Sequence, residues 1–289
     1  MCRQTTHQNG LPSPERSVSD LCQVVGRIRC GASTDDSSVR QHAAAQHGLE
    51  SAPVNDREES PVNSLSILMP VYNEQATIEA AIDDALTAKL PVEKREVIIV
   101  DDGSTDGTRE LLQSRTLPDG VLVLFHPRNQ GKGAAVRTAL DKATCEYAAI
   151  LDADLEYRAA DLGALLEPLA SGDASVVFGT RAWTSQSSFS FWYVMGNKSV
   201  TLATNVLYNC WISDVMTCFK AMRTDLFRSL PLKERGFAIE PEIAARVLRA
   251  GERIHEVPIS YKARSREAGK KLTALDGLRV LRTLIRCRL

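Results

Sequence analysis

The sequence has no long apolar run, no paired cysteine motif and almost no net charge, and each of these features argues against a class of protein. No run approaches the ~20 apolar residues of a membrane-spanning helix, and the first residues lack the apolar centre of a secretory signal. The seven cysteines include no CxxC pair, which favours reduced thiols in the cytoplasm over a zinc site or a disulfide framework. A formal net charge of −1 gives no overall attraction to nucleic acid or to an anionic membrane.

The composition changes near residue 63. Residues 1–63 are rich in Ser, Gln, His, Asn, Pro and Asp and show no sustained periodicity. Such a segment cannot bury enough apolar surface to offset the entropy of ordering it, so we expect a disordered N-terminal extension. A transit peptide is the alternative for its first part. Residues 64–289 are expected to form a single domain.

Short apolar runs alternate with helical patterns from Leu65 onward. The runs, rich in Val, Ile and Leu, are LSILMPV, EVIIVD, VLVLF, YAAILD and SVVFG. Runs of this kind are typical of strands buried on both faces. The segments around residues 78–86, 134–143 and 162–169 place apolar side chains on one helical face. The alternation predicts an α/β fold with a doubly wound, mostly parallel sheet and helices on both faces.

Polar residues follow three of the predicted strands. They are Tyr72 and Glu74 after the first run, Asp101 and Asp102 at the end of the second, and Asp152 and Asp154 at the end of the fourth. Ligands of parallel α/β sheets bind beyond the carboxyl ends of the strands, so we expect these side chains to share one crevice. Capping of the following helices accounts for one aspartate in each loop but not for pairs.

The segment LDADLE predicts a divalent metal site. Asp152, Asp154 and Glu156 occupy alternate positions, which point the same way on an extended strand end. Clustered hard oxygens suit Mg²⁺ or Mn²⁺, ions that share their coordination with substrate phosphates. Nearby, Lys132 opens a helix in QGKGAAV, where its charge and the helix N-terminus suit a phosphate. The alternative for Lys132 is a solvated side chain, and the absence of GxxxxGKS excludes a P-loop.

Several motifs, taken in order, resemble those of a known enzyme family. MPVYNE, VDDGSTDGT, NQGKGAAVR, DADLE and GTR look like glycosyltransferase family 2, which has the GT-A fold with a Rossmann-like nucleotide-binding half. SDVMTCFKAMR, GFAIEPEI and EVPISYKARSREAGKK resemble its dolichyl- and polyprenyl-phosphate hexosyltransferase branch, which includes the dolichol-phosphate mannose synthases. The resemblance extends over residues 65–289.

The resemblance implies a metal-dependent enzyme that takes a hexose from a nucleotide sugar, GDP-mannose or UDP-glucose. The residues that it implies for binding the nucleotide sugar are Pro70, Tyr72, Glu74, Asp101, Asp102, Lys132 and Asp152. The ligands that it implies for Mg²⁺ or Mn²⁺ are Asp152, Asp154 and Glu156. The mannose synthases usually carry Gln at the position of Glu156.

The same resemblance implies a polyprenyl or dolichyl phosphate as the acceptor. Arg181 would reach the acceptor phosphate, and Arg264 and Lys271 lie in a loop suited to closing on phosphates. Asp154, Asp214 and Arg181 form the expected catalytic set. Asp214 is conceivable as a general base, but a lipid phosphate is already an anion, so orienting sugar hydroxyls or acceptor-site cations suits it better. The expected reaction is a single inverting displacement.

The C-terminal segment predicts a basic amphipathic helix. Arg279, Arg282 and Arg286 form one stripe, and the adjacent face carries Leu278, Leu281, Ile285 and Leu289. Such a helix is typical of membrane-surface binding; the alternative is a terminal helix that packs its leucines on the sheet. Residues 188–212 add aromatic and aliphatic side chains. We therefore expect a cytoplasmic protein, peripheral at the cytoplasmic face of the membrane.

Other functions compete with this interpretation. A family 2 transferase could use a glycan or a diacylglycerol as its acceptor, and a non-enzyme scaffold could bind a sugar nucleotide. A phosphoreceiver domain also carries paired aspartates at a strand end, but it has no role for the second acidic loop.

Overall fold

The computed structural model describes residues 63–181, 191–262 and 274–289. The chain divides by its contacts into Met1–Val54, which lies outside the described residues, and Asn55–Leu289, which holds the domain. The expectation for residues 1–62 and the expected acceptor residues Arg264 and Lys271 also lie outside the described residues. The domain boundary near residue 63 therefore stays a proposal.

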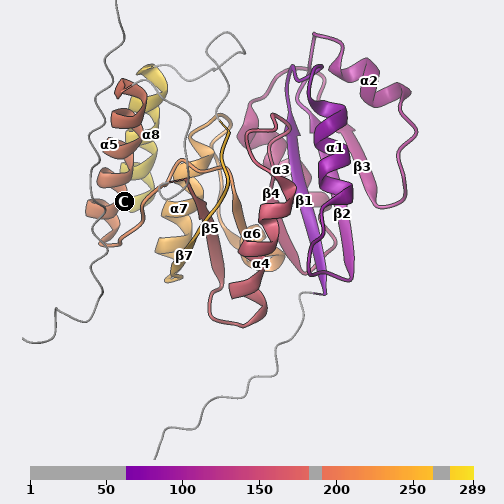
Figure 1. Ribbon diagram of the computed structural model, residues 1–289. Helices are drawn as coiled ribbons and strands as arrows, with labels where there is room; N and C mark the ends of the chain where they lie inside the picture. Colours follow the sequence, from indigo (N-terminus) through magenta and orange to yellow (C-terminus); the bar gives the residue numbers. More distant parts are fainter. Residues whose placement is uncertain (1–62, 182–190, 263–273) are drawn as a thin grey trace, which may run out of the picture. The chain divides into compact units, whose positions relative to one another are not determined.

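One seven-stranded sheet forms the centre of the domain, in the order β3-β2-β1-β4-β6-β5-β7 (Figure 1). Its strands are β1 (Ser64–Val71), β2 (Lys94–Asp101), β3 (Val121–Phe125), β4 (Tyr147–Ile150), β5 (Val176–Thr180), β6 (Lys220–Arg223) and β7 (Ile254–Pro258). All neighbouring strands pair in parallel except β6, which is antiparallel to β4 and β5. The predicted mostly parallel α/β sheet is confirmed.

Helices cover both faces of this sheet, as the doubly wound pattern predicted. They are α1 (Ile78–Thr87), α2 (Thr108–Ser114), α3 (Lys132–Lys142), α4 (Leu162–Ala170), α5 (Phe191–Tyr208), α6 (Thr224–Ser229), α7 (Ile239–Arg249) and α8 (Ala274–Arg288), with a short 3-10 turn η2 (Ala159–Asp161) before α4. Ile67 and Met69 of β1 join a core with α1 and α4, whereas Leu68 joins a second core with α3 and α7. Alternate side chains of a strand point to opposite faces, so each strand supplies both cores.

The reversed strand β6 brings a lysine to the edge of the sheet at which the carboxyl ends of the parallel strands lie. The carboxyl ends of β1, β2, β4 and β5 share one edge because these strands run the same way. Since β6 runs the opposite way, its first residue, Lys220, lies at that same edge, opposite Phe178 of β5. A fully buried lysine is thereby delivered beside the acidic loops.

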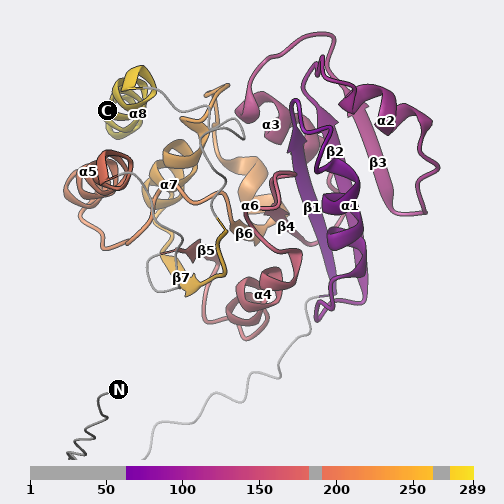
Figure 2. The same ribbon diagram turned by 45° about the horizontal axis from the view of Figure 1, so that its top comes forward.

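Helices α5, α7 and α8 form a layer at the end of the domain far from β3 (Figures 1 and 2). Side chains from all three helices, including Val200, Ile243 and Leu284, share the second core. The Tyr208 hydroxyl of α5 donates to the Leu284 carbonyl of α8 at 2.7 Å. Among the described residues, no helix is long and apolar enough to cross a bilayer.

Candidate active site

The loops after β1 and β2 are joined by Asp106. Its Oδ2 accepts the Gln75 backbone N–H at 3.0 Å, and its Oδ1 accepts the N–H and the hydroxyl of Thr108 at 3.0 and 2.6 Å. Burial alone would raise the pKa of Asp106, but these hydrogen bonds lower it. The Thr108 hydroxyl oxygen in turn accepts the Glu74 N–H at 2.9 Å. Asp106 therefore fixes the MPVYNE loop against the DDGST loop.

The expected nucleotide-sugar residues of the first loop lie at this edge of the sheet. Pro70 is buried within β1, and Tyr72 and Glu74 are half-buried beyond its end. One carboxylate oxygen of Glu74 accepts the Thr77 hydroxyl at 2.9 Å. Their predicted role stays a prediction.

Asp101 forms a buried ion pair inside the protein. Its Oδ2 lies 2.7 Å from a guanidinium nitrogen of Arg109, and its Oδ1 accepts the Ser104 N–H at 3.1 Å. The side chain is fully buried. These contacts give Asp101 a structural task in shaping the loop, and binding to a nucleotide sugar stays a prediction for it.

Asp102 holds the glycine-rich turn before α3. Its two carboxylate oxygens accept the backbone N–H groups of Gln130 and Gly131 at 2.9 and 2.7 Å, and Oδ1 lies 2.6 Å from Nδ1 of His126. A Cβ at Gly131 or Gly133 would collide with the backbone of the segment before α7, so glycine is required for this close approach. Asp102 thereby sets the start of α3 and the position of Lys132.

Lys132 is a buried ammonium with three partners. Its Nζ lies 2.7 Å from Oδ2 of Asp152, 2.8 Å from Oε1 of Glu240 and 2.9 Å from Sγ of Cys218. Burial alone would lower the pKa of Lys132, but the negative charges of Asp152 and Glu240 raise it well above its usual value. The alternative of a solvated lysine is therefore wrong, because the side chain is only 9% exposed.

A second lysine completes the buried charges. Nζ of Lys220 lies 2.6 Å from Oε2 of Glu240, so Glu240 bridges Lys220 and Lys132. Burial would raise the pKa of Glu240, but the two ammonium groups lower it. The resulting lysine cluster, which we define as Lys132, Asp152, Lys220 and Glu240, holds two positive and two negative charges.

Asp152 keeps one acceptor for a ligand. Its Oδ1 is buried and has no hydrogen-bond partner, a costly state unless a donor or cation arrives. Asp154 is half-buried, and its Oδ1 accepts the Glu156 N–H at 3.0 Å. Between them and Glu156, Leu155 has a left-handed backbone with φ 57°, a conformation that is rare outside glycine and concentrated at functional sites.

The expected three-carboxylate metal set is not assembled as a cage. Within residues 63–181, 191–262 and 274–289, no group of three or more His, Cys, Asp or Glu side chains is arranged to hold a metal ion. Oε2 of Glu156 accepts the Tyr261 hydroxyl at 2.7 Å. Mg²⁺ is commonly held by one or two carboxylates together with substrate phosphates. The carboxylates of Asp154 and Asp152, the latter with one unpartnered oxygen, have the chemistry for such a site, and ligation by Asp152, Asp154 and Glu156 stays a prediction.

Arg181 and Asp214 form a bidentate pair beyond β5. Nε and Nη2 of Arg181 donate to the two carboxylate oxygens of Asp214 at 2.6 and 2.8 Å, and the Asn197 amide of α5 adds a hydrogen bond at 3.1 Å. Burial would raise the pKa of Asp214, but the Arg181 charge and these hydrogen bonds lower it. Asp214 therefore holds the Arg181 guanidinium, which also lies 5.0 Å from the ring centroid of Tyr261, and the catalytic and acceptor-site roles expected for this pair stay predictions.

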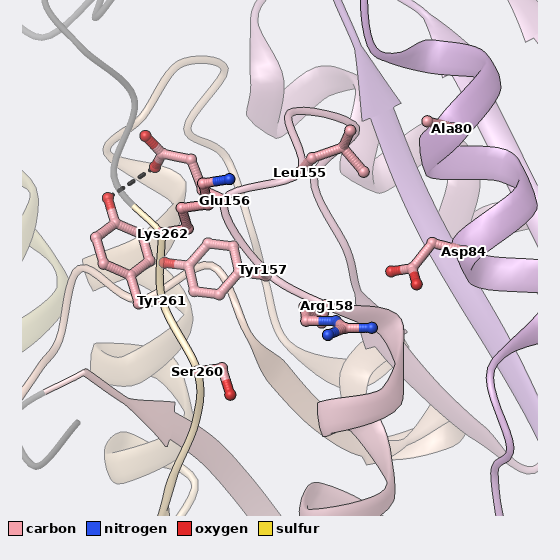
Figure 3. Close-up of a pocket in the computed structure, with 9 residues that line it drawn as sticks. All are labelled: Ala80, Asp84, Leu155, Glu156, Tyr157, Arg158, Ser260, Tyr261 and Lys262. Carbon is pink, nitrogen blue, oxygen red and sulfur yellow. Dashed lines mark hydrogen bonds between the residues drawn. The ribbon is translucent and has the colours of Figure 1, made fainter. Parts of the chain in front are cut away.

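A cavity of about 680 Å³ lies beside the acidic loop, between it, α1 and the segment after β7 (Figure 3). It is lined by Ala80, Asp84, Leu155, Glu156, Tyr157, Arg158, Ser260, Tyr261 and Lys262. The Tyr261 hydroxyl points to Glu156 in this view. Neither Asp154 nor the lysine cluster lines this cavity, so we locate the candidate site by its converging charges rather than by this hollow.

Sequence reasoning did not assign roles to Lys220, Glu240, Tyr261 or His126. Glu240 lies within the GFAIEPEI motif, and an acid inside an apolar run is the signal that marks it. Lys220 begins the apolar strand KAMR, where an unpaired charge would be costly. His126 and Tyr261 carry no comparable sequence signal.

Comparison with known proteins identifies the family. Residues 66–230 match the sequence profile described as Glycosyl transferase family 2. Glycosyltransferase AglJ of Haloferax volcanii is 30% identical over 203 residues, covering 70% of this chain and 64% of that protein. The undecaprenyl-phosphate 4-deoxy-4-formamido-L-arabinose transferase of Pseudomonas aeruginosa is 31% identical over 188 residues, covering 62% of this chain and 55% of that protein. The chain spans less than two thirds of the length of these curated relatives.

Solved structures show the same fold. The glucosyl-3-phosphoglycerate synthase of Mycobacterium tuberculosis with bound UDP has a TM-score of 0.59 and 21% identity, covering 78% of this chain and 80% of that one. A further structure of that synthase, with Mn²⁺, UDP-glucose and phosphoglyceric acid, has a TM-score of 0.59 and 22% identity and covers the same shares. The predicted GT-A fold is confirmed.

Replacing Lys220 with Met tests the lysine cluster. The change leaves the buried Glu240 with one ammonium partner instead of two, which should lower the free energy of unfolding by about 3–5 kcal/mol. The matched control is Arg223→Met on the same strand, because Arg223 forms an exposed ion pair with Asp225 that contributes at most about 1 kcal/mol. Urea unfolding measures both, and equal effects would contradict the buried network.

The lowered pKa of Asp214 predicts a pH dependence of stability. A carboxyl group whose folded pKa is lowered stabilises the fold fully above its unfolded pKa of about 3.9 and loses that effect as the pH falls toward the folded pKa. The difference in unfolding free energy between the wild type and Asp214→Asn should therefore be constant above about pH 5 and shrink below about pH 4. Urea unfolding across that range measures it, and a difference that grows at low pH would contradict the ion pair with Arg181.

Proposed function

The chain belongs to glycosyl transferase family 2, and we propose that it transfers a hexose from a nucleotide sugar, GDP-mannose or UDP-glucose, to a polyprenyl or dolichyl phosphate. One structural observation carries the proposal. Tyr261 joins the acidic loop to the cation beyond β5: its hydroxyl donates to Glu156 at 2.7 Å and its ring lies under Arg181 at 5.0 Å. Groups suited to a diphosphate–metal complex and a group suited to an anionic acceptor therefore lie on either side of one side chain.

The lysine cluster explains why a divalent ion is needed. Its two ammonium groups are matched by two carboxylates, so the cluster offers no net positive charge to a diphosphate. Asp154 and the unpartnered oxygen of Asp152 would hold Mg²⁺ or Mn²⁺. When bound, such an ion neutralises the negative charge that develops on the departing diphosphate. Lys132 orients Asp152 for this task through their 2.7 Å contact.

Arg181 supplies the acceptor side of the proposed reaction. A planar guanidinium suits an oxyanion of a phosphate, and Asp214, which itself accepts a hydrogen bond from Asn197, holds it in place. An acceptor phosphate oxygen would form the new bond to C1 of the hexose while the C1–O bond to the diphosphate breaks and its electron pair leaves with the nucleoside diphosphate. The phosphate is already ionised, so no general base is required. The product has the inverted anomeric configuration.

The acceptor class also draws support from a relative. The name of the Pseudomonas aeruginosa protein identifies undecaprenyl phosphate as the carrier on which it acts. A polyprenyl phosphate is anchored in a membrane by its apolar chain, which fits an enzyme at the cytoplasmic face of that membrane. The competing acceptors, a glycan or a diacylglycerol, lack the phosphate group that a guanidinium such as that of Arg181 suits.

Incubation of the purified full chain with GDP-mannose or UDP-glucose, a short-chain polyprenyl phosphate and Mn²⁺ tests the proposal. The expected product is a hexosyl phosphoryl polyprenol, identified by mass spectrometry, and its formation should stop when the ion is chelated. Transfer only to a glycan or to diacylglycerol would overturn the proposed acceptor. Binding of the donor with no transfer to any acceptor would favour the scaffold.

Replacing Asp154 with Asn should reduce turnover by at least about 100-fold, because one charged ligand of the ion is lost. Binding of Mn²⁺ in the presence of nucleoside diphosphate, followed by calorimetry, should weaken in parallel. Asp119→Asn is the matched control, since Asp119 is exposed in the loop before β3. Undiminished turnover of Asp154→Asn would remove the ion from the mechanism.

Replacing Arg181 with Gln should impair the use of the acceptor without impairing the binding of the donor. The catalytic efficiency for polyprenyl phosphate should fall about 100-fold or more, because a charge-assisted contact to the acceptor is lost. Binding of nucleoside diphosphate with Mn²⁺ should change little. Steady-state kinetics with each substrate varied in turn gives both values, and a defect confined to donor binding would contradict the assignment.

A further inference from the structure

The outward face of α8 carries an apolar stripe that nothing in the described part of the chain covers. Leu278 is 67% exposed, Ile285 is 51% exposed and Leu289 is 95% exposed. The residues of α8 that are buried against the protein are Val280, Thr283, Leu284 and Cys287. The alternative in which this helix packs Leu278, Leu281, Ile285 and Leu289 on the sheet is therefore wrong.

The outward face of α5 has the same character. Leu202 is 63% exposed and Val206 is 73% exposed, whereas Val200 and Thr204 of the same helix are buried. Phe191 and Met195 extend the stripe toward the start of α5, and Trp211 follows the helix with 88% exposure. The buried sides of α5 and α8 both pack with α7, and the two helices lie side by side (Figure 2). We call the exposed side chains of α5, Trp211 and α8 the α5–α8 face.

Basic side chains border these apolar stripes. Helical spacing places Arg282 and Arg279 on one side of the α8 stripe and Arg288 on the other, and all three are exposed. Lys198 is exposed among the apolar residues of α5, which contains no Asp or Glu. An apolar stripe bordered by arginines is the pattern of a helix lying in a membrane interface.

We propose that the α5–α8 face binds the surface of an anionic lipid bilayer. Its apolar side chains enter the interface, and its arginines and lysine meet the anionic headgroups, each basic residue near such a surface adding about 1 kcal/mol. A second copy of the chain is disfavoured as the occupant, because two basic faces would then oppose each other. The local basic charge is effective although the net charge of the whole chain is only −1.

The face is continuous with the candidate acceptor site. On α5, Asn197 donates to Asp214 at 3.1 Å, and Nζ of Lys198 donates to the Ser213 carbonyl at 3.3 Å. The helix that meets the bilayer thus also supports the pair that holds Arg181. This link rests on the proposed function: it places the candidate site at the surface of the membrane that holds the acceptor phosphate.

Co-sedimentation of the full chain with phosphatidylcholine vesicles, with and without phosphatidylglycerol, tests the proposal. The wild type should bind the anionic vesicles, and binding should weaken between about 0.1 M and about 1 M NaCl, as the Debye length falls from ~10 to ~3 Å. Leu202→Glu and Leu278→Glu should each lower the partition coefficient at least about tenfold. Leu122→Glu is the matched control, because Leu122 is 41% exposed on β3, at the other end of the sheet.

Unfolding midpoints of the variants should match the wild type, and transfer to a water-soluble, short-chain polyprenyl phosphate should be unchanged. Absence of wild-type binding to anionic vesicles would overturn the membrane face while leaving the proposed function intact if that transfer proceeds. A dimer that is seen by light scattering and is dissociated by Leu202→Glu would also overturn the membrane face, because a second copy of the chain would then be its partner. Vesicle binding without transfer to any acceptor would support the membrane face and would contradict the proposed function.

Discussion

The candidate site depends on the lysine cluster, in which positive and negative side chains alternate in the order Lys220, Glu240, Lys132 and Asp152. Taking any one of these ions out of water costs several kcal/mol, and the cost is offset only when each ion meets its opposite at close range. The three ion pairs of the lysine cluster, with N–O distances of 2.6 to 2.8 Å, meet that condition. The reversed direction of β6 delivers Lys220, and the turn held by Asp102 delivers Lys132. Asp152 is thereby oriented with one oxygen engaged and the other available.

A second set of contacts connects the acidic loop to the rest of the molecule. Glu156 meets Tyr261, the Tyr261 ring lies beside Arg181, and Arg181 is paired with Asp214. Asn197 extends this connection to α5. The acidic loop, the Arg181 guanidinium and the exposed apolar helix α5 are thus joined by continuous contacts, which is the arrangement that the proposed transfer to a lipid phosphate requires.

The sequence was sufficient for strands β1 to β5 and for the loops that follow them, but it did not predict the reversed strand β6. Apolar runs such as LSILMPV and EVIIVD revealed doubly buried strands, and paired aspartates at their ends indicated where the polar edge lies. It was insufficient for the partners of those aspartates. The Asp101 carboxylate turns to Arg109 and the Asp102 carboxylate to the turn before α3, since tertiary packing decides which donors surround a buried acid.

The sequence was likewise insufficient for contacts between residues that lie far apart along the chain. Glu240 reaches Lys132 only because α7 begins beside α3, and no local pattern encodes that approach. The amphipathic pattern of α8 left open which face would be buried, and the packing against α7 settled it in favour of Val280 and Leu284.

A crystal structure with nucleoside diphosphate and Mn²⁺ tests the location of the site most directly. We expect the ion on Asp154 with the unpartnered oxygen of Asp152 nearby, and the diphosphate at the start of α3. A diphosphate seated instead in the cavity beside Ser260 and Asp84, with the ion away from both aspartates, would contradict it.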